Sequence, residues 1–524
     1  MANKTFKAGQ SEQTLGEKKQ PVERQDFIHI AILVTIALAI GVYLIATTVL
    51  IAKDGVFYIE RAQNFLTDPI NIIKEHPPGY PFLVLMAHKF TGLFSNNSSA
   101  QSWVYSAQSI TLLCRLFALI PLYFTGRILV GSRKSFWAVL ILMILPHSAK
   151  LGCEVVREWP YILFLSVGFL CLLAGANQPK WWVLGLAGLS TGMGYLIREE
   201  SAQIVIYGLV WFALCMFLPR LCGLSQCKII IALASLLIGF AIPTIPYMKF
   251  TGQIIPAKMK NLPNIPFSNT LPDKTDIQKV NAVRANYNVA EIVSPNVLKA
   301  LGEVFRTTGE NLMWFFMPAL AIGLYCRFRS NAKRKERFLI TAFVLINVTM
   351  IALRYCYVQP HVSARWNLPL ITFTIFYIPV GLQVIGNWLE SKFPMNKQKT
   401  DLSQDKEGTW FLVLLLIGIS ICIPKLFTPL RIEDQSYREA ANWLKENTAP
   451  TAIVAVPDKR IAFYAERKGL EYDKQIPEQV DYVVRIVESE DEKLVFDKET
   501  KEEYSTPVNK DRKRGKLVIC RVIH

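Results

Sequence analysis

Long apolar runs recur along this chain of 524 residues and restrict what it can fold into. The first extends from about Ile28 to Ala52, which is long enough for one helix to cross the hydrocarbon core of a bilayer. It is too long for the core of a signal peptide, and no small-residue cleavage site follows it, so we expect a retained helix. With 52% hydrophobic and 19% charged residues, the chain is predicted to be a polytopic α-helical membrane protein.

The lengths of the apolar runs predict about eleven transmembrane helices. They divide the chain into a disordered cytoplasmic tail over 1–27, a transmembrane domain over 28–428 and a soluble domain over 429–524. Two outer loops are expected within the transmembrane domain, at 53–103 and 249–311. The first loop has helical periodicity in two pieces, which we expect to lie along the membrane surface.

Basic residues decide the predicted orientation. The net charge is +17, and the Lys and Arg residues gather in turns that all fall on one side, most densely over Arg327–Arg337. Because cytoplasmic loops carry the excess of Lys and Arg, Asp54 and the C-terminus are predicted to lie outside the cytoplasm. The same bias explains the positive charge without nucleic-acid binding. We expect an integral protein of the bacterial inner membrane, surrounded by membrane lipids.

The last hundred residues lack long apolar runs and read as a small soluble domain. A helical pattern over 436–444 is followed by three short apolar segments, at 452–456, 482–484 and 516–520. Helices alternating with buried strands are typical of an α/β domain.

Charged residues are concentrated at the predicted outer ends of the helices. They come from four separate links: Asp54, Glu154, Arg157, Glu158, Arg198, Glu199, Glu200, Arg354, His361 and Arg365. If the helices form a bundle, these links meet in one outer cavity of acids and arginines. A carboxylate there can act as a general base, and arginines can bind a phosphate leaving group. The pattern therefore favours transfer from an activated, lipid-borne phosphate donor.

Each of these residues also has a structural explanation, which the sequence leaves open. Asp54 can be a solvated helix end, and Glu158 can pair with Arg157 or cap the helix that follows. Arg198 and Arg365 can extend along apolar surface to reach the interface. A histidine such as His76 or His361 can orient a turn. The sequence favours a structural role for Glu154, whereas Tyr58 and Tyr80 fit an amphipathic surface helix as well as a sugar site.

Several motifs together resemble those of GT-C glycosyltransferases. Asp54-Gly55 with Tyr58, followed by His76–Pro81 (HPPGYP), is similar to the first outer loop of family 39, which includes protein O-mannosyltransferases and the lipid A aminoarabinose transferase. Three further segments resemble later motifs of that family, namely Arg157–Pro160 (REWP), Tyr195–Glu199 (YLIRE) and Arg365–Pro369 (RWNLP). The order of these motifs resembles the family over residues 28–520.

The resemblance implies a hexosyl- or pentosyltransferase that inverts configuration and uses a polyprenyl-phosphate sugar donor. Asp54 is expected to be the general base and Glu158 the second acid, with Glu154 the alternative. The expected substrate-binding residues are His76, Tyr58, Tyr80, Glu154, Arg157, Arg198, His361 and Arg365. Many family members have Asp-Glu where this chain has Asp54-Gly55, which leaves the acceptor class open among glycolipid, glycan and protein of the cell envelope.

No cofactor is implied. The acids leave a divalent ion open, but no ligand spacing argues for one, so no metal-binding residue is predicted. A secondary transporter is one rival interpretation, although it requires related halves and charges at mid-membrane, and neither is evident. A non-catalytic membrane assembly protein, with the soluble domain as an interaction module, is the other.

Overall fold

The structure is a computed structural model that describes residues 22–93, 99–176, 179–218, 224–252, 297–330, 332–357, 361–393, 408–472, 476–477, 479–487, 499–510 and 513–523. Most of the tail predicted over 1–27 and most of the loop predicted over 249–311 lie outside these ranges. Where the two predicted segments are described, both hold helix. The first helix begins at Arg24, and a helix occupies Val297–Asn311.

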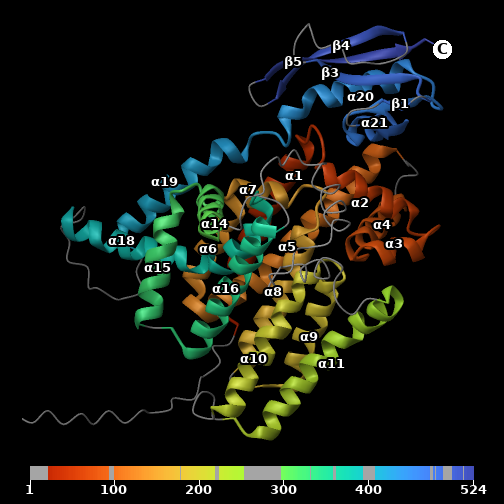
Figure 1. Cartoon of the computed structure of the whole chain (residues 1–524). Helices are drawn as coiled ribbons and strands as arrows, with labels where there is room; N and C mark the ends of the chain where they lie inside the picture. Colours follow the sequence, from red (N-terminus) through yellow and green to blue (C-terminus); the bar gives the residue numbers. More distant parts are fainter. Residues whose placement is uncertain are drawn as a thin grey trace, which may run out of the picture.

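Apolar helices make up most of the described chain (Figure 1). Within the described residues, eight spans are long and apolar enough to cross a membrane. Four of them are the single helices α1 (Arg24–Ala46), α5 (Ala100–Val130), α8 (Glu158–Gly175) and α11 (Gln226–Thr251). Two more are α16 (Arg334–Tyr357) and α19 (Thr409–Leu426). The seventh span consists of η1 (Glu199–Ala202) and α10 (Gln203–Phe217). The eighth consists, in chain order, of η3 (Ala364–Asn367), α17 (Leu368–Thr374), η4 (Ile375–Tyr377) and α18 (Ile378–Lys392).

Three of the expected crossings are helices too short to span a bilayer alone. Helices α6 (Ser132–Ile144) and α9 (Trp181–Tyr195) have 13 and 15 residues. Helix α15 (Phe316–Ser330) follows α14 (Val297–Asn311) at a bend of 109°, and the pair could form a ninth span. Fifteen helical residues extend about 22 Å, which is less than the hydrocarbon thickness of a typical bilayer.

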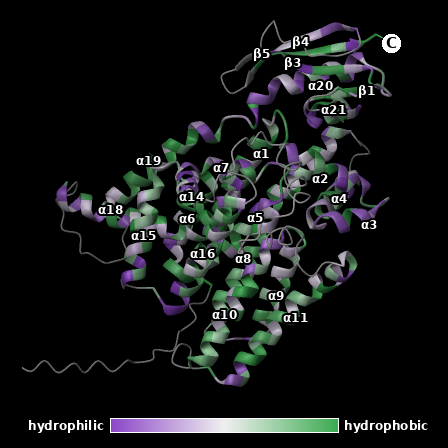
Figure 2. Ribbon diagram, in the orientation of Figure 1, coloured by the Kyte–Doolittle hydropathy of each residue, from purple (hydrophilic) through white to green (hydrophobic). Residues whose placement is uncertain are grey.

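Although short, α9 is packed tightly into the bundle. A β-carbon at Gly188 would lie 2.1 Å from the carbonyl oxygen of Leu236 in α11, so only glycine allows the two backbones to come this close. On the outer side of α11, Ile230, Ile238 and Ile242 are exposed, as expected for a face in contact with lipid. Figure 2 shows hydrophobic residues along the bundle helices and more hydrophilic ones in the C-terminal domain.

The first helix starts earlier than its apolar run because a charged residue in its first turn is buried. Asp26 accepts a hydrogen bond from the Tyr123 hydroxyl at 2.7 Å and pairs with Arg127 at 3.1 Å. Both partners lie on α5, so the beginning of α1 is fixed against that helix.

The segment between α1 and α5 is helical, as predicted, but it forms three helices rather than two, which we call the surface helices. These are α2 (Lys53–Asn64), α3 (Pro69–Glu75) and α4 (Gly79–Gly92), which lie at the end of the bundle that carries the C-terminal domain (Figure 1). A further short helix, α7 (Pro146–Leu151), leads from α6 toward the link before α8.

The C-terminal domain is an α/β unit, as predicted. Helices α20 (Gln435–Asn447) and α21 (Lys459–Ala465) pack with one sheet in the order β2-β1-β3-β5-β4. The three predicted strands correspond to β1 (Ile453–Val456), β3 (Tyr482–Val487) and β5 (Lys513–Val522). Strand β1 is parallel to β2 and β3, whereas β5 is antiparallel to β3 and β4. The edge strands β2 (Lys468–Glu471) and β4 (Thr500–Lys510) escaped prediction because they are mostly polar.

Candidate active site

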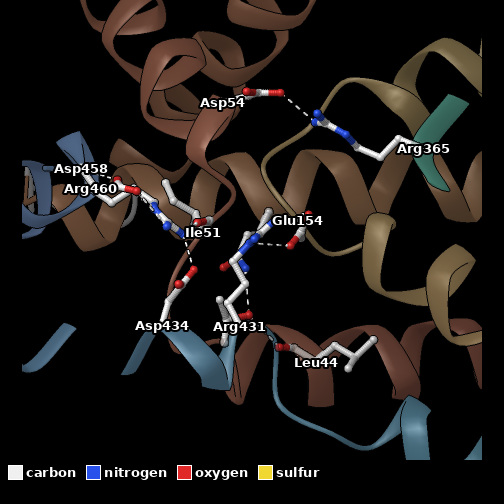
Figure 3. A network of polar contacts seen from close by, with 11 residues as sticks. Leu44, Ile51, Asp54, Glu154, Arg365, Arg431, Asp434, Asp458 and Arg460 are labelled. Atoms are coloured by element: carbon white, nitrogen blue, oxygen red, sulfur yellow. Dashed lines mark hydrogen bonds and ion pairs between the residues drawn. The ribbon is translucent and has the colours of Figure 1, made fainter. Parts of the chain in front are cut away.

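Asp54 lies in the first turn of α2, where a carboxylate is favoured by the helix dipole. The helix begins directly after Ala52, whose carbonyl accepts a hydrogen bond from the Gly55 amide at 2.8 Å. The side chain of Asp54 is half-exposed, and Arg365 of η3 donates from Nη1 to its Oδ2 at 2.7 Å (Figure 3). An acid and an arginine 311 positions apart in the sequence therefore meet at one end of the bundle.

Gly55 allows this helix to lie against the link that carries the other acids. A β-carbon at Gly55 would lie 3.0 Å from Cβ and 3.3 Å from the carbonyl oxygen of Val155. Val155 stands in the chain between Glu154 and Glu158. A larger residue at position 55 would push α2 away from this link, so the departure from the Asp-Glu pattern has a packing reason.

Glu158 and Arg198 form a buried pair beside this surface. Glu158 begins α8, and Arg198 follows α9, with exposed fractions of only 6% and 8%. Glu158 Oε1 lies 3.9 Å from Arg198 Nη1, and Glu200 Oε2 lies 3.3 Å from Arg198 Nε. Burial alone lowers the pKa of the Arg198 guanidinium, but the Glu200 and Glu158 carboxylates outweigh it and raise that pKa.

This pair retains unused hydrogen-bonding capacity. Within the described chain, Glu158 Oε2 and Arg198 Nη1 are buried without a hydrogen-bond partner, whereas Arg198 Nε faces Glu200. Buried polar atoms are rarely left unbonded in folded proteins. The arrangement therefore provides an acceptor and a donor for a polar ligand.

Glu154 is engaged differently. Its carboxylate is buried and pairs with Arg431 Nε at 3.0 Å, at the beginning of the C-terminal domain (Figure 3). Burial raises the pKa of the Glu154 carboxyl above its usual value, while Arg431 and Arg365 act in the opposite direction. Sequence reasoning did not single out Arg431, although it is the first basic residue beyond the last apolar run.

The Pro-Pro-Gly motif docks the surface helices onto the link that carries Arg198. The Gly79 amide donates to the carbonyl of Leu196 at 2.7 Å. From the other side, Arg157 Nη1 donates to the carbonyl of Ile197 at 3.4 Å. Both contacts fix the backbone that places Arg198.

We expect Gly79→Ala to destabilise the protein by about 1–3 kcal/mol, as overpacking of a close contact commonly does. The new β-carbon would lie 2.8 Å from the Leu196 carbonyl oxygen, which is backbone and cannot rotate away. The midpoint of thermal unfolding in detergent measures the effect. Gly92→Ala in the same helix is the matched control, since a β-carbon there meets nothing within 4 Å. Equal midpoints for the two variants would contradict this explanation.

Four aromatic side chains on or directly beside the surface helices form a cluster. The rings of Tyr58 and Tyr80 meet edge to face at 5.0 Å, and Phe57 meets the ring of His76 in the same way at 5.3 Å. Burial raises the pKa of the Tyr58 hydroxyl, on which the charges of Arg157, Glu158, Asp54 and Arg198 also act. Tyr58 therefore lies where the acids and arginines converge.

Tyr80 and His361 are placed less favourably for substrate contact. Tyr80 is buried, and its hydroxyl shares a hydrogen bond with the Thr111 hydroxyl at 2.9 Å. Its ring therefore packs against Tyr58 from the protein interior. His361 is exposed in the segment before η3. In the part of the chain that the structure describes, no group of three or more His, Cys, Asp or Glu residues could hold a metal ion.

One charged residue inside an apolar run was overlooked. Arg115 lies within α5 and is fully buried, donating to the carbonyls of Met143 at 2.9 Å and Ala149 at 3.5 Å. A β-carbon at Gly152 would lie 2.2 Å from Arg115 Cδ, so glycine makes room for this side chain. Arg115 thus fixes the α6–α7 break ahead of the link to Glu154 and Glu158.

Comparisons with known proteins concern the sequence family and the fold. Residues 75–245 match the family model for dolichyl-phosphate-mannose-protein mannosyltransferase, a segment that includes His76, Glu158 and Arg198. A search of curated proteins finds no match to the chain.

Solved structures resemble the whole fold at low sequence identity. ArnT from Cupriavidus metallidurans bound to undecaprenyl phosphate is 12% identical, with a TM-score of 0.53, over 95% of this chain and 98% of that one. Its apo state gives 12% identity and a TM-score of 0.51, over 94% and 98%. The apo oligosaccharyltransferase of Archaeoglobus fulgidus gives 15% identity and a TM-score of 0.52, over 88% and 70%. The fold is therefore shared by three structures of two membrane glycosyltransferases.

Proposed function

We propose that the chain is a membrane glycosyltransferase of the GT-C superfamily, and that it transfers a sugar from a polyprenyl-phosphate donor to an extracytoplasmic acceptor, with inversion at the anomeric carbon. The observation that carries the proposal is the meeting of Asp54 and Arg365 beside the buried Glu158–Arg198 pair. We place the site on the extracytoplasmic face because the basic turns lie on the opposite side of the predicted membrane. We place the protein in the bacterial inner membrane.

The proposed reaction is a single displacement. A hydroxyl or amine of the acceptor attacks the anomeric carbon while Asp54 accepts its proton as general base. The bond from that carbon to the phosphate oxygen breaks, and its electron pair leaves with the polyprenyl phosphate. The charge that develops on the phosphate is then stabilised by arginine, whose N–H groups match phosphate oxygens.

Arg365 has two tasks in this proposal. Its Nη1 holds the Asp54 carboxylate, and a guanidinium has further N–H groups that can reach a phosphate. Arg198 supplies the buried donor Nη1, and Glu158 the unbonded acceptor for a sugar or acceptor hydroxyl. Undecaprenyl phosphate bound to the similar ArnT supports a lipid phosphate as the leaving group.

The rival interpretations gain less from the structure. A transporter is expected to place its charged site near mid-membrane, whereas these acids and arginines lie at helix ends. An assembly protein has no need of a buried, unbonded donor beside an acid.

Turnover of defined donors tests the function. Purified protein in detergent is incubated with a panel of polyprenyl-phosphate sugars, with and without crude cell-envelope membranes as acceptor, and free polyprenyl phosphate is measured. We expect release from at least one donor, and that donor identifies the sugar. If folded protein released no polyprenyl phosphate under either condition, the proposed function would be contradicted and the assembly-protein interpretation would be favoured.

A further inference from the structure

The segment that leads into α2 is held at alternate residues by the C-terminal domain. The Val49 amide donates to the carbonyl of Leu430 at 3.1 Å. The Ile51 carbonyl accepts from Arg460 Nη1 at 3.2 Å, and Lys53 Nζ lies 2.9 Å from Glu471 Oε1. Three contacts from three parts of the domain therefore fix residues 49–53, immediately before Asp54.

Arg460 forms the buried centre of this contact. Its guanidinium donates from Nε and Nη2 to both oxygens of Asp458 at 3.0 and 2.9 Å, and from Nη1 to Asp434 Oδ2 at 2.7 Å. The three side chains lie together (Figure 3). All three are buried, with exposed fractions of 3% to 6%. We call Arg460, Asp434 and Asp458 the domain clamp.

The clamp carries more charge than the domain needs to fold. Burying one cation between two carboxylates costs desolvation free energy. Apolar side chains of similar volume at such positions commonly stabilise the folded state as much as the buried ions do. What an apolar residue could not do is donate to the buried Ile51 carbonyl while both carboxylates hold the guanidinium in one orientation. The geometry is thus suited to fixing a backbone position.

We propose that Arg460 is a positioning residue, which holds the start of α2 so that the Asp54 carboxylate meets Arg365 and the substrate in a reactive geometry. The C-terminal domain is then part of the catalytic apparatus, although Arg460 itself does not touch the substrate. This inference rests on the proposed role of Asp54. It assigns the domain a task that its sequence, free of any catalytic motif, does not reveal.

Arg460→Lys is the variant that tests the inference. Lysine keeps a positive charge between the two carboxylates but loses the fork that reaches Ile51. Arg467→Lys is the matched control, because the described hydrogen bonds of Arg467 run to Lys445, Thr448, Ala465 and Glu466 of the same domain. Both variants lose one arginine fork from the domain, and only one of them loses the contact to α2.

In donor turnover, we expect Arg460→Lys to lower kcat between about tenfold and 100-fold with KM unchanged, as small displacements of a catalytic group do. Arg467→Lys should keep the wild-type kcat. Asp54→Glu displaces the carboxylate by one methylene. It should lower kcat by a smaller factor in the Arg460→Lys background than in wild type, because Arg460→Lys has already displaced this carboxylate. Full additivity, or an equal fall in kcat for both arginine variants, would overturn the inference.

Hydrogen exchange of the α2 amides separates this inference from the proposed function. We expect faster exchange over 53–64 in Arg460→Lys and wild-type exchange in Arg467→Lys, whether or not any donor is turned over. If wild type releases no polyprenyl phosphate, the proposed function fails while the exchange rates still decide whether the clamp holds α2. Unchanged exchange in Arg460→Lys would overturn the inference.

Discussion

Replacing Asp54 with Asn is expected to lower the rate of polyprenyl-phosphate release about 1,000-fold, because a general base contributes roughly 10²–10⁴ to such a step. Asparagine has nearly the same shape but cannot accept the proton of the acceptor. Since it also loses the ion pair with Arg365, the rate alone does not separate the two effects.

A longer carboxylate tests the role of the base more directly. Asp54→Glu keeps a group that can accept a proton and is expected to retain more activity than Asp54→Asn. Glu60→Gln on the same helix is the matched control, because Glu60 is exposed and should be replaceable without effect. Activity of Asp54→Asn close to wild type would remove Asp54 as the base.

Arg198→Leu is expected to destabilise the protein by about 3 kcal/mol, since removing one partner of a buried ion pair leaves the other charge uncompensated. Glu158 would remain buried without the guanidinium beside it. The midpoint of thermal unfolding, followed by tryptophan fluorescence, measures the loss. Activity measured below the unfolding transition should also be lost, because the leucine offers no donor to the phosphate.

Two further substitutions sharpen this prediction. Arg198→Lys should restore most of the stability but little of the activity, because lysine keeps the charge and loses the paired geometry. Arg306→Leu is the matched control, since Arg306 is exposed and its two ion pairs on α14 are of the weak surface kind. If Arg198→Leu unfolded at the wild-type midpoint, the buried pair would not contribute to the stability of the fold.

Much of the fold followed from the sequence because apolar length and basic turns are local signals. They predicted eight long spans, helix between α1 and α5 and the three apolar strands of the C-terminal domain, but three of the eleven expected crossings are helices of only 13 to 15 residues. The lengths of α6 and α9 were harder to predict, because an apolar run does not show where a helix breaks. Strands β2 and β4 were missed because their polar residues carry no burial pattern.

The candidate site was predicted as a set of charges, but its pairings were not. Asp54 and Arg365 meet only because the bundle brings their separate helices together, and nothing near either residue specifies the other. Gly55 and Gly79 were noticed as parts of motifs, whereas their close backbone contacts are visible only in three dimensions. Arg460 lies in a domain without a recognisable motif, so no sequence pattern distinguishes it from the other arginines there.

The most direct test of the account is the position of a polyprenyl phosphate bound to the wild-type protein in a lipid nanodisc, determined by electron cryomicroscopy. We predict phosphate oxygens at hydrogen-bonding distance, about 3 Å, from the guanidinium of Arg365 or Arg198, with the Asp54 carboxylate facing the open side of the phosphate. A phosphate bound instead at the opposite end of the bundle, beside the basic turn of Arg327, would contradict it.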